Sequence, residues 1–319
     1  MALPLLVDCD TGIDDAIALT YLACRDDAEV AGIVSTGGNV PAATVHRNNL
    51  ALSELLGVDA PVALGADRPL VEPPMFADDT HGPGGLGHAV LPEATRAEDP
   101  RSGAQLWVDL ARERPGELVG LVLGPHTNLA HALEIEPELP RLLRRLHVMG
   151  GAINHRGNTG ATSEWNIAVD PEAAQRVLAA FASAPQLPVL GALQATEQIV
   201  FTGAELERLE ALAARSAHPV ARILAEAVRF YFEFHQADGF GWTAHVHDPL
   251  VTAHALTGKF ASTRPLPVDV ELAGTLTRGQ TVGDELGRWG RGPTVELLDE
   301  VRPAEFVEHL LGTLEAGLG

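Results

Sequence analysis

The sequence predicts an α/β fold: a single domain with one open, Rossmann-like, mostly parallel sheet flanked by helices. Short runs rich in leucine and β-branched residues alternate with segments of helical periodicity, which is typical of a sheet covered by helices. The 319 residues are enough to bury roughly 75% of the unfolded surface in one large core. No internal repeat or low-complexity linker divides the sequence, so we expect one domain over residues 1–319.

The first half of the chain alternates expected strands and helices. The expected strands are Leu3–Val7, Val30–Ser35, Pro61–Leu64, Leu118–Leu123 and Leu146–Met149. The expected helices are Ile13–Cys24, Pro41–Leu56, Gly103–Glu113 and Asn128–Ile135. Between them, Gly65 to Asp99 is rich in glycine and proline and has little periodicity. A loop this long predicts a functional or mobile segment.

The second half continues the pattern after a glycine-rich loop, Gly150–Gly160. The expected helices are Pro171–Phe181, Ala204–His235, Pro249–Leu256 and Ala304–Leu314. The expected strands are Leu187–Leu190 and pieces near Val268–Leu272 and Val295–Leu298. A loop rich in glycine, histidine and aromatic residues, Asp238–His247, separates two of the helices.

Composition excludes several classes of protein. The 43 acidic and 22 basic residues give a formal net charge of −21, which argues against a nucleic-acid partner. No run approaches the ~18 apolar residues that a membrane helix needs, so we expect no membrane partner. Cys9 and Cys24 are too few for a disulfide framework, and Met1–Val7 lacks the features of a signal peptide. We therefore expect a cytoplasmic protein.

Polar side chains gather where expected strands end, and ligands of open α/β sheets bind at the carboxyl ends of the strands. Asp8, Asp10, Asp14 and Asp15 follow the first strand. Four carboxylates in one corner repel one another unless they share a cation, and hard cations such as Ca²⁺ prefer oxygen ligands. The alternative is that two of the acids only complement the positive end of the following helix. A calcium-binding EF-hand loop fits poorly, because Leu19 stands where it needs glutamate.

Four further sets of residues carry weaker signals. His247-Asp248-Pro249 is a helix start that also pairs an imidazole with a carboxylate. Glu164 and Asn166, if extended, would point the same way and could grip sugar hydroxyls, although an ordinary loop with a buried Trp165 is the alternative. The remaining signals are a glycine-rich segment after His81, and Tyr231 and His235 four residues apart on one helical face.

Together these pieces resemble a known family. The segment Asp8–Ala16 is similar to the Asp-x-Asp-x-Gly-x-Asp-Asp-Ala signature of the nucleoside hydrolases, the inosine–uridine preferring ribohydrolases. The other matching segments follow in the family's order: Asn39 after Gly-Gly, His81-Gly, Thr127-Asn128-Leu129-Ala130, Met149-Gly150-Gly151, Glu164-Trp165-Asn166 and His247-Asp248-Pro249. The resemblance runs from Asp8 to about Leu256. It implies ribonucleoside cleavage to ribose and free base, in purine or pyrimidine salvage, by a homodimer or homotetramer.

The resemblance also implies roles for single residues. One Ca²⁺ would be held by Asp10, Asp15, Asp248 and the backbone carbonyl of Thr127. Asp14 would take a proton from a water held by the cation, and Asp8 would support the cluster from behind. The ribose would be held by Asn39, Met149, Glu164 and Asn166. At the base, His247 would protonate or hydrogen-bond the leaving group, with His81 beside it and a wall of Trp165, Tyr231 and His235. His126 and Trp165 depart from the family pattern, so the base preference stays open.

Two other functions remain alternatives. A Mg²⁺-dependent phosphohydrolase of the haloacid dehalogenase type would use Asp8 as nucleophile, but it expects threonine where Gly12 stands. It also needs a basic residue near the phosphate, and Lys259 is the single lysine. A non-catalytic, metal-dependent nucleoside-binding protein would need neither Asp14 nor His247.

Overall fold

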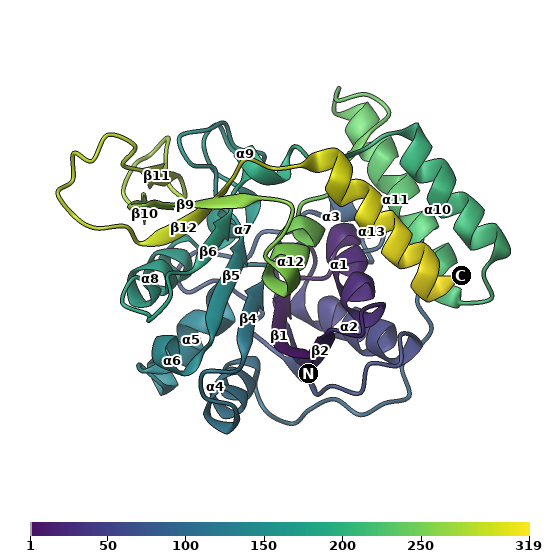
Figure 1. Ribbon diagram of the computed structural model, residues 1–319, viewed down its shortest axis with the longest axis horizontal. Helices are drawn as coiled ribbons and strands as arrows, with labels where there is room; N and C mark the ends of the chain where they lie inside the picture. Colours follow the sequence, from purple (N-terminus) through teal and green to yellow (C-terminus); the bar gives the residue numbers. More distant parts are fainter. Residues whose placement is uncertain (1) are drawn as a thin grey trace.

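The centre of the computed structural model, which describes residues 2–319, is an eight-stranded sheet (Figure 1). The strand order is β3-β2-β1-β4-β5-β6-β12-β9; all neighbours are parallel except the edge strand β9, which is antiparallel to β12. The strands are β1 Leu3–Cys9, β2 Ala28–Ser35, β3 Val62–Leu64, β4 Val119–Val122, β5 Arg145–Met149, β6 Val189–Gly191, β9 Ser262–Leu266 and β12 Val295–Asp299. The predicted α/β fold with a mostly parallel sheet is confirmed.

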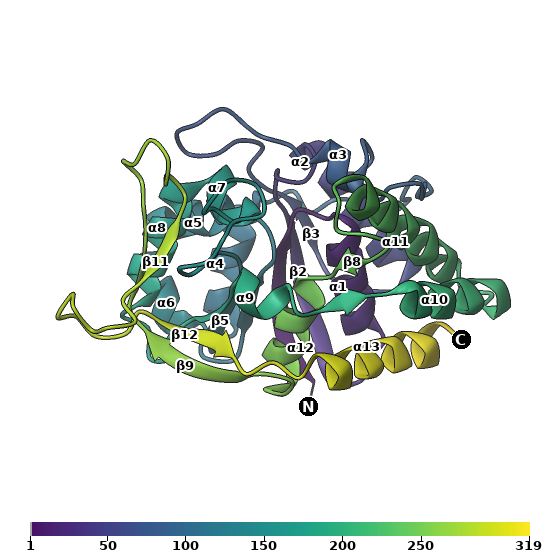
Figure 2. The same ribbon diagram turned by 90° about the horizontal axis from the view of Figure 1, so that it is seen from above.

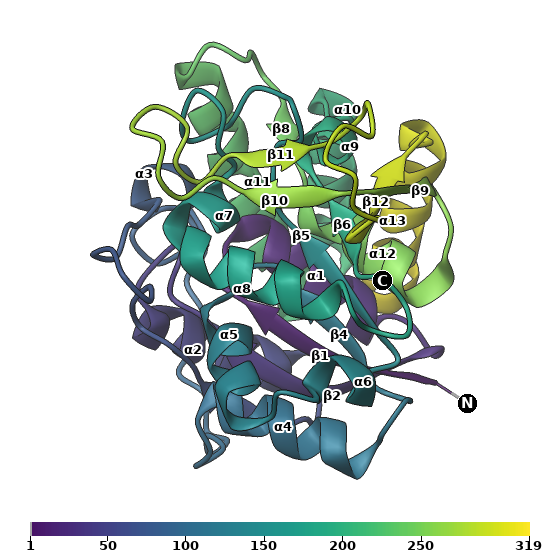
Figure 3. The same cartoon turned by 90° about the vertical axis from the view of Figure 1, so that its left-hand side faces the viewer.

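Helices cover both faces of this sheet, because successive residues of a strand point to opposite sides. Leu5 and Val7 belong to the core on one face, and Leu6 belongs to the core on the other. The first core packs against α1 Ile13–Ala23, α2 Ala42–Leu55, α10 Gly203–Arg215, α11 Pro219–Ala237, α12 Asp248–Thr257 and α13 Pro303–Leu318. The second packs against α4 Gly103–Glu113, α5 Thr127–Ile135, α6 Leu139–Leu142 and α8 Pro171–Phe181, the layer in front of the sheet in Figure 3.

Shorter elements complete the chain. They are α3 Asp78–His81, α7 Trp165–Val169, α9 Leu193–Thr196, β7 Val200–Phe201, β8 Ala244–His245, β10 Val268–Val270 and β11 Thr281–Gly283. Two antiparallel pairs, β7 with β8 and β10 with β11, lie outside the main sheet. None of the helices within residues 2–319 is both long and apolar enough to cross a membrane.

Two sequence-based expectations are wrong in detail. The single helix expected over Ala204–His235 is two helices, because Pro219 starts α11 and the His218 side chain caps it. The extended stretch expected around Glu164 and Asn166 is instead the start of α7, with the Glu164 side chain accepting from the backbone N–H groups of the first turn. Glu164 and Asn166 therefore lie close together because Glu164 caps the helix in which Asn166 lies, and not because they alternate along a strand.

The order of the strands fixes where a ligand can enter. From β1 the chain moves outward through β2 and β3, then returns to β4 on the other side of β1. Loops after β1 and β4 therefore leave the sheet in opposite directions, which opens a crevice at their carboxyl ends. Figure 2 shows α3, α7 and α11 at this end of the molecule and both chain termini at the other.

Candidate active site

A cavity of about 550 Å³ occupies this crevice. All but two of the residues predicted for the site line it; those that do are Asp10, Asp14, Asn39, His81, Met149, Glu164, Trp165, Asn166, Tyr231, His235, His247 and Asp248. The two exceptions, Asp15 and Thr127, are buried beside lining residues. The fold thus brings segments spread between Asp10 and Asp248 together around one cavity.

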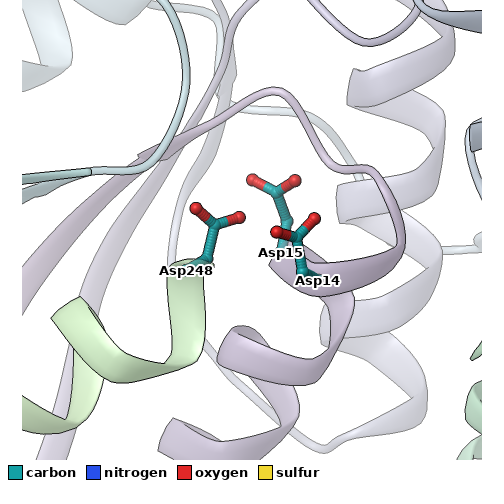
Figure 4. A group of neighbouring side chains, drawn as sticks. All are labelled: Asp14, Asp15 and Asp248. Carbon is teal, nitrogen blue, oxygen red and sulfur yellow. The ribbon is translucent and has the colours of Figure 1, made fainter. Parts of the chain in front are cut away.

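Three buried carboxylates form the acidic floor: Asp14 and Asp248 line the cavity, and Asp15 lies behind them. Asp14 and Asp15 lie in the first turn of α1, and Asp248 is the first residue of α12 (Figure 4). One oxygen from each lies within 4.8 Å of the others, close enough to share a metal ion. Both helices begin at this point, so their partial positive ends face the negative charges. The helix ends offset only part of the negative charge of the three carboxylates, because each end supplies only about half a positive charge.

Asp10 lies against the same floor in a recess made by glycines. Its Oδ2 accepts a hydrogen bond of 2.8 Å from the backbone N–H of Asn39. A Cβ on Gly38 would lie 2.2 Å from Asp10 Oδ2, and one on Gly124 would lie 2.8 Å from Asp10 Oδ1. Glycine is therefore needed at both strand ends for the carboxylate to fit.

Two oxygens of this cluster have no hydrogen-bond partner within residues 2–319: Asp10 Oδ1 and Asp15 Oδ1. The other oxygen of Asp15 accepts from the backbone N–H of Gly12 at 2.8 Å. A buried carboxylate oxygen without a partner is costly, and a divalent cation bound between these oxygens would remove this cost. The donor set is all oxygen, which suits Ca²⁺ or Mg²⁺ better than zinc.

Electrostatics point to the same conclusion. Burial, followed by the charge of Asp14, raises the pKa of Asp15 to about 8. Burial and neighbouring carboxylates also raise the pKa of Asp10 and of Asp248 well above the usual range. Positive charge in this site, as protons or as a metal ion, would therefore relieve the repulsion between the buried carboxylates.

Thr127 begins α5, directly after the loop that follows β4. Its Oγ1 donates a 2.7 Å hydrogen bond to Asp170 Oδ2, and Asp170 also caps α8 by accepting from the backbone N–H of Ala173. The Thr127 hydroxyl is thus engaged away from the acidic floor. Asp170 was not predicted; an aspartate directly before a proline-initiated helix is the signal that identifies it as a cap.

Asp8 lies behind the floor and does not line the cavity. Its two oxygens accept hydrogen bonds from Thr36 Oγ1, from Trp107 Nε1 at 2.8 Å and from Asn128 Nδ2 at 3.0 Å. Burial raises the pKa of Asp8 to about 6 despite these donors. Three donors hold this carboxylate in place, so its position suits a supporting residue and leaves little room for a nucleophile.

Glu164, Asn166 and Met149 form one side of the cavity. Glu164 Oε2 accepts from the backbone N–H of Gly151 at 2.8 Å, and Asn166 Nδ2 donates to the backbone carbonyl of Leu123 at 2.8 Å. Burial, opposed by hydrogen bonds from the backbone N–H groups of Asn166, Gly151 and Ile167, raises the pKa of Glu164 to about 6. These bonds fix an acceptor and an amide beside the acidic floor, where they can bind hydroxyl groups.

The opposite side is a wall of aromatic rings. His81 packs against Tyr231 with ring centroids 5.4 Å apart, and Tyr231 packs against His235 at 4.6 Å. The α11 spacing of four residues thus places Tyr231 and His235 on one face, as predicted. Burial lowers the pKa of His81 to about 4 and that of His247 to about 3. Neutral, flat side chains of this kind suit a planar ring.

Several further residues of this wall are not predicted from the sequence. His245 stacks on His247 with ring centroids 6.2 Å apart, and its alternation with His247 in the loop before α12 is the signal that could have found it. Phe240 and the ion pair between Arg156 and Glu197, 3.0 Å long, also line the cavity. Phe240 and Arg156 lie in exposed loops, where sequence patterns say little about the direction of a side chain, and Glu197 caps the C-terminal end of α9.

Comparisons with known proteins show the family to which the chain belongs. Residues 5–308 match the family described as inosine-uridine preferring nucleoside hydrolase. The chain is 36% identical to the pyrimidine-specific ribonucleoside hydrolase RihA of Citrobacter koseri, over 97% of each chain. It is 35% identical to the protein of that name in Salmonella typhimurium, over 99% of each.

Solved structures show the same relationship. The purine-preferring ribonucleoside hydrolase from Gardnerella vaginalis superposes with a TM-score of 0.90 at 29% identity, over 99% of this chain and 98% of that one. The plant nucleoside hydrolase PpNRh1 superposes with a TM-score of 0.90 at 27% identity, over 98% of this chain and 99% of that one. This chain therefore belongs to the inosine-uridine preferring nucleoside hydrolase family and is a hydrolase acting on N-glycosyl compounds.

Proposed function

We propose that this protein is a Ca²⁺-dependent ribonucleoside hydrolase that releases ribose and free base for purine or pyrimidine salvage. One observation carries the proposal: buried aspartates with unpartnered oxygens lie at the floor of a cavity that has hydroxyl-binding groups on one side and aromatic rings on the other. A nucleoside has the matching parts, since its ribose carries hydroxyls and its base is planar.

The proposed ligands of the cation are Asp10, Asp15, Asp248 and the backbone carbonyl of Thr127. The unpartnered Asp10 Oδ1 and Asp15 Oδ1 and the raised pKa of these acids support this set. The family is metal-dependent, and Ca²⁺ accepts six to eight oxygens in flexible geometry. When bound, the cation supplies charge that holds the attacking water and lowers its pKa.

Asp14 is the proposed general base. It lines the cavity, whereas Asp15 lies behind it, so its carboxylate can reach a water beside the substrate. In the reaction the water oxygen forms a bond to C1′ of the ribose and its proton passes to Asp14. The closeness of Asp14 to Asp15 and Asp248 also makes it a competing candidate for a metal ligand. Turnover and metal binding, measured separately, decide between these roles.

Glu164, Asn166, Asn39 and Met149 are proposed to hold the ribose. As the C1′–N bond breaks, the sugar becomes positively charged, and the net negative floor stabilises that charge more than it stabilises the neutral substrate. Buried acceptors that lose their hydroxyl partner are costly. We therefore expect the site to select ribonucleosides over 2′-deoxyribonucleosides.

The base leaves with the electron pair of the C1′–N bond and carries developing negative charge. His247 is proposed to assist it by a proton or a hydrogen bond, with His81 beside it and Trp165, Tyr231 and His235 around the ring. The low pKa of His247 favours the hydrogen bond over full proton transfer. The greater identity to pyrimidine-specific relatives supports uridine and cytidine as preferred substrates over purine nucleosides.

Other parts of the proposal concern the whole protein. We propose that residues 1–319 act as a single nucleoside hydrolase domain, supported by the family match over residues 5–308. A homodimer or homotetramer in the cytoplasm is proposed as well; unpaired Cys9 and Cys24 support a reducing compartment.

The test is a panel of ribonucleosides assayed for free ribose, with Ca²⁺ and with a chelator. We expect ribose release that stops on chelation and returns with Ca²⁺. Phosphate release from phosphate esters would instead indicate the Asp8-dependent phosphohydrolase. Saturable nucleoside binding without base release would indicate the non-catalytic binding protein.

A further inference from the structure

A buried hydroxyl lies behind the base side of the cavity. Thr196 is the last residue of α9 and is fully buried. Its Oγ1 lies 2.9 Å from Nδ1 of His247. Within residues 2–319, this imidazole nitrogen is the one hydrogen-bond partner of the Thr196 hydroxyl. The backbone of His247 is anchored separately, because its N–H donates to Asp14 Oδ2 at 3.3 Å.

This geometry decides which nitrogen of His247 carries the proton. If Nδ1 were protonated, it would donate to Thr196 Oγ1, and the hydroxyl hydrogen would be buried without an acceptor. If the hydroxyl donates to Nδ1, both groups are satisfied. A neutral imidazole then carries its proton on Nε2, the nitrogen left for the cavity that His247 lines.

Neighbouring histidines show that the surroundings select each tautomer. Nδ1 of His81 accepts from the backbone N–H of Ile13 at 3.1 Å, so His81 also keeps its proton on Nε2. Nδ1 of His235 and Nδ1 of His245 instead face backbone carbonyls, at 2.8 and 3.0 Å, and must be protonated to donate to them. Among these four rings, His247 is the one whose tautomer depends on a side chain, and it can therefore be tested by mutation.

We propose that Thr196 is a positioning residue that holds His247 in the Nε2–H tautomer, so that His247 donates a hydrogen bond to the departing base. This inference rests on the proposed role of His247 at the leaving group. The base keeps the electron pair of the broken bond, the hydrogen bond stabilises its charge, and solvent supplies the proton that neutralises it. An Nδ1–H tautomer would instead turn a lone pair toward the developing negative charge.

The first test compares Thr196→Val with Thr196→Ser. Valine keeps the shape and removes the hydroxyl but leaves His247 in place, so we expect kcat/KM for uridine and inosine to fall about 10- to 100-fold, at or below the lower end of the 10²- to 10⁴-fold range of acid–base assistance. For p-nitrophenyl riboside, whose leaving group departs unaided, we expect less than about a 3-fold change. Thr196→Ser should restore most of the nucleoside activity. The matched control is Thr20→Val, which removes a buried hydroxyl bonded to the Ala16 carbonyl, away from the cavity.

The second test reads the tautomer without turnover. Histidine ring ¹⁵N spectra, with His247 assigned by its absence in His247→Gln, should show Nε2–H in the wild type and a change of tautomer in Thr196→Val. An Nδ1–H tautomer in the wild type, or equal losses on nucleosides and p-nitrophenyl riboside, would overturn the inference. A wild-type protein that cleaves neither substrate would overturn the proposed function and this role with it, whereas cleavage of both with an unchanged Thr196→Val overturns the inference alone.

Discussion

The position of the Asp14 carboxylate is compatible with two proposed roles, that of a metal ligand and that of a general base. It is part of the carboxylate cluster with Asp15 and Asp248, and it also lines the cavity and accepts from the His247 backbone. A metal ligand and a general base both need an ionised carboxylate close to the cation. They differ in what remains when the charge is removed. Loss of a ligand weakens metal binding, whereas loss of a base stops turnover with the metal still bound.

The variant Asp14→Asn separates these roles. We expect kcat for uridine to fall roughly 10²- to 10⁴-fold, the range for loss of a general base. Calorimetric Ca²⁺ affinity should stay within about 10-fold, because three carboxylates besides Asp14 remain. Asp79→Asn is the control, since Asp79 is an exposed carboxylate at the same cavity. A loss of Ca²⁺ affinity that parallels the loss of turnover would make Asp14 a ligand instead.

At the scale of elements, the site depends on glycines in the loops that follow two of the strands. Gly38 follows β2 and Gly124 follows β4, and both give room to the carboxylate of Asp10. Neither glycine has a positive φ, so their role is space rather than backbone conformation. The ends of three neighbouring strands must therefore approach closely for the acidic floor to form.

Gly38→Ala tests this close approach. The new methyl group would meet Asp10 Oδ2, so we expect the carboxylate to move and Ca²⁺ affinity to fall by about 10-fold or more, with a parallel loss of activity. The control is Gly292→Ala, at an exposed glycine without positive φ and with nothing within 4 Å of the added Cβ. Unchanged Ca²⁺ affinity in Gly38→Ala would show that the strand ends can separate freely.

The same elements show what sequence can predict. The bounds predicted for Gly103–Glu113 and Pro171–Phe181 are those of α4 and α8, because both segments have amphipathic helical periodicity. The edge strand β9 was missed, since its partly exposed Ser262–Leu266 lacks an apolar run. The carboxylates after β1 were found because they follow a strand directly. Thr196 and Asp170 were not, because their roles arise from contacts between distant segments.

At the scale of the whole molecule, the protein carries opposing proton linkages. Burial lowers the pKa of His81, His126 and His247. These rings take up protons on unfolding below about pH 6.5, so their contribution to stability is lost as pH falls and is complete near pH 7. The acidic floor acts in the opposite direction, because its carboxylates hold protons in the folded state that the unfolded chain releases.

This linkage predicts the pH dependence of stability. Without metal, Asp15 is protonated in the folded protein up to about pH 8 and ionised in the unfolded chain, so the free energy of unfolding should fall as pH rises from 7 to 8. Asp10 and Asp248 act with the same sign. Saturating Ca²⁺ replaces these protons, so the fall should disappear and stability should rise by RT ln(1 + [L]/Kd).

Urea unfolding at pH 7, 7.5 and 8, with a chelator and with Ca²⁺, measures both curves. Histidines and surface carboxylates contribute equally to the free energy of unfolding with the chelator and with Ca²⁺. The difference between the two curves therefore comes from the buried aspartates at the floor of the cavity. We expect this difference to grow with pH, because more protons must leave the metal-free floor at the lower pH before the cation binds. Parallel curves would mean that the buried carboxylates are already ionised without metal. Burial at the strand ends would then not raise their pKa values enough to favour a bound proton or cation.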